Sequence, residues 1–322
     1  MLGGIDIDAL TGENDDRIDH VVLRPRAPFR LDLTAWALRR RKRNQIDRWD
    51  GTYRRALLAG DRAVTVEIEQ CGGPDDPCLI IRSLTGGFRS AEERHSIETQ
   101  LVRMLGTNID LGGFYALADE DALVGPLADR LRGVKPPRFP SLFEALVNAI
   151  ANQQLSLEVG IELLNRITER FGEHPADGHG LIAFPEPAAV LGGSIHDLRE
   201  LGFSMRKAEY VMDCAHAVLT GAIDEATLEV ADRATATDLL TGLRGIGRWS
   251  AEYVVLRGLG SIDVFPADDV GARNKLQRFF ALPTPPDRKQ ILTLMEPWVP
   301  YAGMMYFHML LDGLAERGDI HP

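Results

Sequence analysis

Apolar positions in the first part of the chain recur with the spacing of β-strands. Between residues 20 and 84 they alternate with polar positions or form short runs, which predicts strands at 20–23, 29–34, 62–70 and 78–84. Helical spacing interrupts the strands at 49–59 and follows them at 91–105. The pattern therefore indicates an α+β domain built on an antiparallel sheet over residues 19–114. Residues 1–18 are acidic and glycine-rich without periodicity, so we expect a disordered tail there.

From Phe114 onward the strand signals disappear and only helical spacing remains. Apolar residues follow this spacing at 142–152, 156–171, 195–201, 206–219, 236–243, 248–256, 269–280 and 302–317. Glycine and proline separate these segments, for example at Gly172, Pro185 and Gly221. The remainder of the chain is thus expected to be all-helical, with the stiff proline-rich stretch 135–140 as a connection.

Composition limits the class of protein. A hydrophobic content of 45% over 322 residues is enough for two or three packed domains. No apolar run reaches the length of a membrane span and the N-terminus lacks a basic-then-apolar signal, so we expect a soluble, cytoplasmic protein without a membrane partner. The cysteines Cys71, Cys78 and Cys214 are too few for an iron–sulfur cluster held by four thiolates. The eight histidines show no metal-ligand spacing, which argues against a catalytic transition metal.

The charge balance is acidic. With 36 basic and 47 acidic residues the net charge is −11, the wrong sign for binding nucleic acid through bulk electrostatics. One segment departs from this balance, because residues 39–55 contain eight basic side chains against Asp47 and Asp50. Such a segment forms either a solvated basic helix face or a patch that faces DNA, and the sequence leaves both interpretations open.

Three short motifs carry the candidate chemistry. The first is the turn Gly245-Ile246-Gly247 between two helical runs, which leaves backbone amides free to bind an anion such as phosphate. The second is Asp268-Asp269 behind Pro266 at a predicted helix start, where the helix dipole favours a carboxylate. The third is Asn-Gln-Gln-Leu-Ser at 152–156, in the tight link between two helices. A phosphate-binding turn with a fixed anion nearby points to chemistry on nucleic acid.

In this order the motifs resemble those of the helix-hairpin-helix base-excision DNA glycosylases, and they are most similar to the DNA-3-methyladenine glycosylase II branch. The resemblance covers residues 139–313 well. It implies two helical subdomains with a cleft between them, one formed by 115–138 with 262–322 and carrying the catalytic aspartate, the other by 139–261 with the hairpin. It further implies hydrolytic removal of alkylated bases from double-stranded DNA, with no cofactor and no metal other than a monovalent cation at the hairpin. We expect a monomer.

The aspartate pair supplies the candidate for catalysis. Breaking an N-glycosidic bond passes through an oxocarbenium-like sugar, and a carboxylate on the face away from the leaving base stabilises that charge. The resemblance places this role on Asp269, twenty residues after Trp249, and leaves Asp268 to cap the following helix. The competing interpretation is that both aspartates only cap the helix.

Aromatic residues near the hairpin are candidates for the pocket of the flipped base. Trp249, Tyr253 and Phe307 match family positions that line this pocket, and electron-rich rings stack well on cationic alkylated purines. Ordinary core packing is the alternative for each ring. Trp249 also stands where strand-cleaving relatives carry a lysine nucleophile, so the resemblance implies an enzyme without lyase activity. Val270 and Gly271 replace larger side chains, which predicts a roomier pocket.

The same resemblance assigns DNA binding to the hairpin and to a plug that fills the gap left by the flipped base. The residues expected to contact DNA are Gly245, Ile246, Gly247, Arg248, Gln153, Gln154 and Leu155. Either Gln154 or Leu155 forms the tip of the plug; the alternative is that Leu155 is a core leucine and Gln153 a helix cap. Two functional alternatives also stay open: a glycosylase for oxidised or deaminated bases, and a DNA-damage-binding protein without catalysis.

Overall fold

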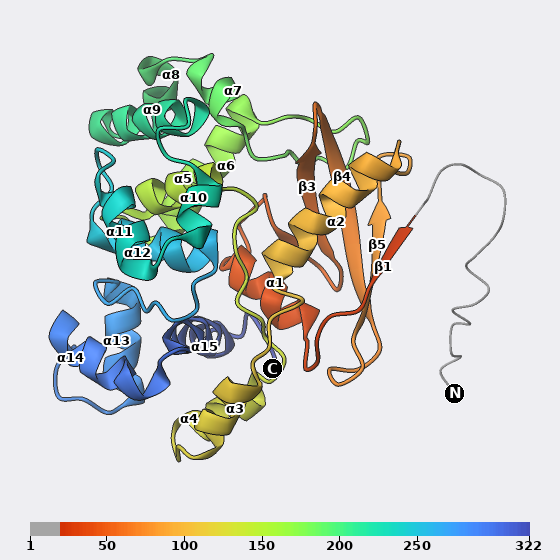
Figure 1. Cartoon of the computed structure of the whole chain (residues 1–322). Helices are drawn as coiled ribbons and strands as arrows, with labels where there is room; N and C mark the ends of the chain where they lie inside the picture. The colour runs from red at the N-terminus through yellow and green to blue at the C-terminus, as the bar shows by residue number, and fades with distance from the viewer. Residues whose placement is uncertain (1–19) are drawn as a thin grey trace.

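A five-stranded antiparallel sheet and a helical body make up residues 20–322, the part of the chain described by this computed structural model (Figure 1). The tail expected at 1–18 lies outside the described residues. In their order across the sheet, the strands are β1 (His20–Leu23), β5 (Cys78–Ser83), β4 (Arg62–Cys71), β3 (Tyr53–Ala59) and β2 (Arg48–Trp49). The predicted α+β fold of the N-terminal region, built on an antiparallel sheet, is confirmed.

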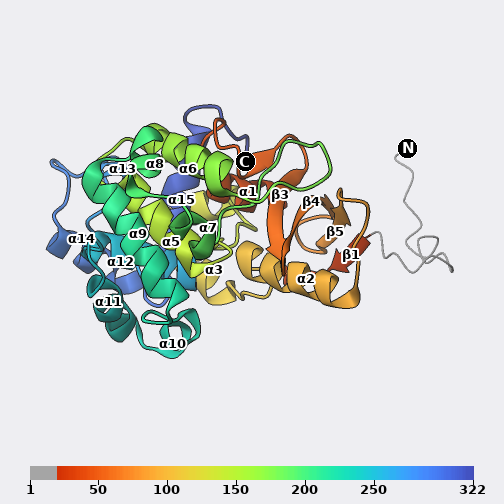
Figure 2. The same ribbon diagram turned by 90° about the horizontal axis from the view of Figure 1, so that it is seen from above.

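Two helices pack against this sheet. Helix α1 (Leu31–Arg39) lies between the sheet and the helical body, and α2 (Ala91–Leu105) crosses one face of the sheet (Figures 1 and 2). Apolar residues of both helices, such as Leu38 and Leu101, share one buried cluster with strand residues. Helix α2 begins where Ser90 accepts a hydrogen bond from the backbone N–H of Glu93, so its start follows from a serine cap.

Two sequence-based predictions in this domain are wrong. Residues 29–34 were expected to form a strand, but α1 begins at Leu31. The run Phe-Arg-Leu-Asp-Leu-Thr alternates apolar and polar residues as a strand does, whereas packing buries this helix on nearly all sides and removes the helical spacing from the sequence. Residues 49–59 were expected to form a helix, but they contain β3, which pairs with β4 from Tyr53↔Ile68 to Ala59↔Arg62. The Gly60-Asp61 turn that closes this hairpin was the missed signal.

The helical body is all-helical, as predicted. Apart from an isolated bridge between Glu173 and Ala183, residues 114–322 contain no strand. The helices are α3 (Gly112–Asp119), α4 (Val124–Arg130), α5 (Leu142–Asn152), α6 (Leu157–Phe171), α7 (Pro187–Leu191), α8 (Ile195–Glu200), α9 (Met205–Leu219), α10 (Glu225–Val230), α11 (Arg233–Thr241), α12 (Arg248–Val254), α13 (Val270–Phe279), α14 (Arg288–Met295) and α15 (Ala302–Ala315). A π-helical turn, Val255–Leu259, extends α12, and a 3₁₀ turn, Glu296–Trp298, follows α14.

Buried contacts join the two parts of the molecule. One continuous apolar cluster runs through the helical body and includes Leu33 and Trp36 of α1. The loop between α6 and α7 reaches across to the strands, where Leu181 packs with Ala56 and Ala63 (Figure 2). The subdomain boundaries predicted from the sequence stay a prediction, since the hydrophobic core is continuous through both helical regions.

Candidate active-site cleft

A cleft of about 1340 Å³ lies between the hairpin region and the helices α13 and α15. All but two of the residues singled out from the sequence line it. Those in the walls are Gln153, Gln154, Leu155, Gly245, Ile246, Gly247, Trp249, Tyr253 and Asp269. Arg248 is exposed outside the cleft lining, and Phe307 is buried in the core.

Asp269 is held by three donors at the start of α13. Its Oδ1 accepts a hydrogen bond from the backbone N–H of Ala272 at 2.7 Å, which makes Asp269 the N-cap. Its Oδ2 accepts from Trp249 Nε1 at 3.1 Å and from the Tyr306 hydroxyl at 3.4 Å. The position at the positive end of a helix favours a carboxylate. The side chain is therefore fixed and its charge faces the cleft.

The structure reverses the predicted choice of Asp268 over Asp269 as the helix cap. Asp268 was predicted to cap the helix, but Asp269 is the cap, and Asp268 pairs with Arg288 at 2.9 Å. The register of a cap depends on the backbone angles at the helix start, which two adjacent aspartates in a sequence do not reveal. The cap uses only Oδ1 of Asp269, so Oδ2 is not part of the cap.

An aromatic wall stands beside Asp269. The rings of Trp249 and Tyr253 lie 5.6 Å apart and are tilted by 31°. Tyr306 of α15 faces them and packs edge-on against Phe265. Burial, and then the charge of Asp269, raise the pKa of Tyr306 well above its usual value, so its hydroxyl stays protonated and donates to Asp269.

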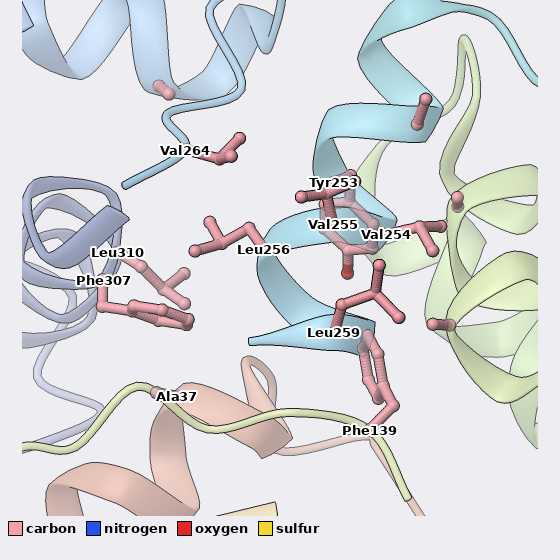
Figure 3. Close-up of a cluster of buried hydrophobic side chains, with 14 of the residues drawn as sticks. Ala37, Phe139, Tyr253, Val254, Val255, Leu256, Leu259, Val264, Phe307 and Leu310 are labelled. Atoms are coloured by element: carbon pink, nitrogen blue, oxygen red, sulfur yellow. The ribbon is translucent and has the colours of Figure 1, made fainter. Parts of the chain in front are cut away.

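Phe307 is not part of this wall, contrary to the sequence-based prediction. It is fully buried in the apolar cluster (Figure 3). The guanidinium of Arg257 lies 5.5 Å from its ring centre. Tyr306 occupies the cleft instead. Successive residues of a helix point about 100° apart, so an offset of one residue separates a pocket position from a core position. The aromatic pair at 306 and 307 gave no signal for choosing between them.

Arg40 of the N-terminal domain contacts Tyr253 of the aromatic wall. The sequence did not predict this contact. Arg40 donates to the Tyr253 hydroxyl at 3.0 Å and to Asn148 Oδ1 at 2.8 Å while being only 4% exposed. The basic segment 39–55 is thus neither a solvated face nor a single DNA patch. Within it, Arg55 is also buried and bonds Asp47 at 2.7 Å together with Glu144 of α5. Long-range partners of this kind are invisible in local sequence.

The hairpin connects α11 to α12 and contains two glycines, Gly245 and Gly247, whose backbone conformations and surroundings differ. Gly245 has φ +86°, and a Cβ there would lie 2.2 Å from the ring of Tyr210. Gly247 is the N-cap of α12 with an ordinary φ of −84°, open space around it and no side chain to cap the helix. The Ile246 side chain is buried and anchors the turn. The backbone at Gly247, where α12 begins, therefore lines the cleft with no side chain over it.

Within the proposed plug, Gln153 binds the hairpin, whereas Gln154 and Leu155 are exposed. Gln153 Nε2 donates to the Gly245 carbonyl at 2.8 Å and to Ser250 Oγ at 2.9 Å, so Gln153 holds the hairpin. Gln154 has φ +54° and is exposed, and Leu155 is 43% exposed. The interpretation of Leu155 as a core leucine is therefore wrong, and the choice of Gln154 or Leu155 as the tip stays a prediction.

The cleft is basic although the chain is acidic. Seven basic side chains and two carboxylates line it, a net formal charge of +5, against −11 for the whole chain. The basic residues are Arg40, Arg41, Arg206, Lys207, Arg244, Lys275 and Arg317. Some are neutralised locally, as Arg244 is by Asp213. The negative charge that argued against nucleic-acid binding thus lies outside the cleft.

Two further features bear on cofactors and membranes. Among residues 20–322, no group of three or more histidine, cysteine or acidic side chains is placed to hold a metal ion. In the same residues, every helix is too short or too polar to cross a bilayer.

Comparisons with known proteins agree with this geometry. Residues 147–300 match the family model described as HhH-GPD superfamily base excision DNA repair protein. A relative from Bacillus subtilis, named putative DNA-3-methyladenine glycosylase YfjP, is 33% identical over 50% of this chain and 55% of its own length. DNA-3-methyladenine glycosylase 1 of Schizosaccharomyces pombe is 33% identical over 49% of this chain and 67% of its own length. The chain thus spans about half to two thirds of these curated relatives.

A solved structure extends the likeness to almost the whole fold. The 3-methyladenine DNA-glycosylase from Archaeoglobus fulgidus superposes with a TM-score of 0.78 at 26% identity, over 90% of this chain and 97% of that chain. The superposition includes the N-terminal sheet domain, which lies outside the residues matched by the family model. The superfamily resemblance inferred from the three motifs is confirmed.

Proposed function

Because the chain belongs to the helix-hairpin-helix superfamily of base excision DNA repair proteins, we propose that it is a DNA glycosylase that removes alkylated bases of the 3-methyladenine type. The observation that carries the proposal is Asp269, a carboxylate held by Trp249 and Tyr306 in a basic cleft. A protein that only bound damaged DNA would gain nothing from a fixed anion beside a polyanion.

The proposed reaction is derived from the residues that line the cleft. The target nucleotide leaves the helix stack and enters the cleft, while Gln154 or Leu155 fills the gap. Its base stacks beside Trp249 and Tyr253, whose ring faces attract a cationic alkylated purine. As the glycosidic bond breaks, positive charge develops on the sugar, and Asp269 stabilises it and aligns the attacking water. The products are the free base and an abasic site.

The proposed enzyme has no lyase activity. Strand cleavage by relatives requires an amine that attacks the sugar and forms a Schiff base, and Trp249 provides none. Its indole instead donates to Asp269 at 3.1 Å. Lys207, which also lines the cleft, has its ammonium bound to the Ala151 carbonyl at 2.8 Å. We further propose that the protein acts as a monomer on double-stranded DNA and needs no cofactor.

Release of bases from duplexes that each contain one lesion tests the proposal. We expect free base from duplexes with 3-methyladenine or 7-methylguanine, at rates well above those for deaminated or 8-oxidised purines. Faster release of a deaminated or oxidised base would assign the other substrate class. Tight binding to all lesions without release of any base would make the protein a damage-binding module.

A further inference from the structure

Lys275 is a half-buried residue of the cleft that the proposed chemistry does not use. It lines the cleft from α13, and none of the hydrogen bonds or ion pairs among residues 20–322 involves it. Burial, and then the positive charge of Arg317, lower the pKa of Lys275 to about 8. A partly desolvated charge without a partner is unfavourable, and such a group in a cleft commonly marks a binding site.

Two arginines add to the positive charge at this place. Arg41 and Arg317 line the cleft together with Lys275, and we call these three residues the basic cluster. A Cβ built on Gly313 of α15 would lie 3.0 Å from Lys275 Nζ and 3.8 Å from Arg317 Nη1, so the two cations are neighbours. Each arginine pairs with one carboxylate, whereas Lys275 has no such partner in the described part of the chain.

Gly313 makes room for the lysine. A Cβ at this position would meet Lys275 Cε at 2.9 Å, so the end of the lysine side chain lies against α15 at a position where the helix has no side chain. A glycine inside a helix is destabilising by about 1 kcal/mol relative to alanine. The helix thus carries a residue of low helix propensity where the lysine needs space.

The basic cluster and the hairpin lie on opposite walls of the cleft. Gly245-Ile246-Gly247 lies between α11 and α12, whereas Lys275 lies on α13 and Arg317 lies just after the end of α15. Asp269 links the two walls, because it accepts a hydrogen bond from Trp249 of α12 and its charge acts on Lys275. A sugar held against Asp269 therefore has a phosphate-binding turn on one side and unpaired positive charge on the other.

From this placement we infer that Lys275, with Arg41 and Arg317, binds a backbone phosphate of the damaged strand next to the flipped nucleotide. The inference rests on the proposed function, because it requires a DNA strand in the cleft. The phosphate supplies the counter-charge that Lys275 lacks in the free protein. The strand is then gripped on both sides of the reacting sugar, which resists its return to the duplex.

Binding of a duplex that contains tetrahydrofuran, a stable abasic analogue, tests the inference without any base release. Lys275→Met should weaken this binding about ten-fold and lower the slope of log affinity against log salt by about 0.9, the loss of one phosphate contact. Lys289→Met is the matched control, because Lys289 is exposed on α14 outside the cleft; it should leave both quantities unchanged. Gly313→Ala should weaken binding as well while keeping the net charge, since its methyl group displaces Lys275.

Single methylphosphonate substitutions along the damaged strand identify the phosphate. One position beside the lesion should weaken binding by the native protein but not by Lys275→Met. Lys275→Met should melt at or above the native temperature, because it removes a charge that has no partner. Gly313→Ala should stay folded, because its methyl group requires only the flexible end of Lys275 to move. An unchanged salt slope in Lys275→Met would overturn the inference, as would equal sensitivity of both proteins to every methylphosphonate. A rise in melting temperature with inorganic phosphate, together with no methylphosphonate effect, would assign the cluster to free phosphate instead. Failure of the native protein to bind any duplex would contradict the proposed function itself.

Discussion

Replacing Asp269 by asparagine isolates the charge on which the proposed reaction depends. The carboxylate accepts from Ala272, Trp249 and Tyr306 through two oxygens, whereas an amide has only one oxygen to offer. If the amide oxygen keeps the helix cap, its NH₂ group faces the donors of Trp249 and Tyr306. We expect this mismatch to cost about 1 kcal/mol of stability, which leaves the protein folded.

The effect on catalysis should be much larger than the effect on stability. Loss of a preorganised charge opposite the developing oxocarbenium ion raises the barrier by about 3 kcal/mol or more. That increase slows base release by roughly a hundred-fold or more. Binding to damaged duplex should be unchanged or tighter in Asp269→Asn, because the contacts to phosphate remain and one negative charge facing the DNA is removed.

Single-turnover base release and equilibrium binding, measured on the same duplex, check this prediction. Asp268→Asn is the control, since Asp268 pairs with Arg288 at 40% exposure and should retain most of the native rate. A native rate in Asp269→Asn would refute the reasoning. Loss of activity in Asp268→Asn with Asp269→Asn active would move the catalytic role to the neighbouring carboxylate.

Three further predictions address the hairpin, the missing nucleophile and acid stability. Gly247→Ala should fold normally, because there is open space around Gly247, but it should bind damaged and undamaged duplex several-fold more weakly in an anisotropy titration. Gly245→Ala should instead lower the melting temperature, because its methyl group would clash with Tyr210. Incubation with alkylated duplex and borohydride should trap no covalent complex. A trapped complex that is lost in Lys275→Met would contradict both the proposed absence of lyase activity and the proposed phosphate-binding role of Lys275. Burial lowers the pKa of His308 to about 4, below the value of about 6.5 in an unfolded chain. The unfolded state therefore binds a proton at His308 between these two pH values, and about 2 kcal/mol of stability should be lost between pH 7 and 5. A melting temperature that falls equally in His308→Leu would show that another group is responsible.

The sequence predicted what depends on local pattern and on short motifs. The helix Leu142–Asn152 was predicted to the residue because Ser141 caps its start and its apolar periodicity continues to its end. The hairpin was recognised because it consists of a few adjacent residues with a defined backbone role, whereas the choice of Asp269 over Asp268 rested on the family resemblance and its spacing from Trp249. Periodicity failed at α1, which is buried on nearly all sides, and at β3, which the turn at Gly60-Asp61 joins to β4.

The parts of the site that escaped prediction depend on distant contacts. Arg40 contacts Tyr253 across 213 residues of sequence, and the end of Lys275 lies against Gly313 of another helix. The choice of Tyr306 over Phe307 depends on the rotation of α15 about its axis, which is set by packing on both sides of the helix. Such arrangements follow from the assembled core, so no single segment of the sequence contains them.

Release of free base from methylated DNA is the most direct test of the central claim. The purified protein is incubated with duplex treated with a methylating agent, the released bases are separated and identified by mass spectrometry, and the strand is analysed before and after alkali. The account predicts free 3-methyladenine, with nicks that appear only after alkali. Intact methylated bases after prolonged incubation, with the protein bound to the duplex, would contradict it.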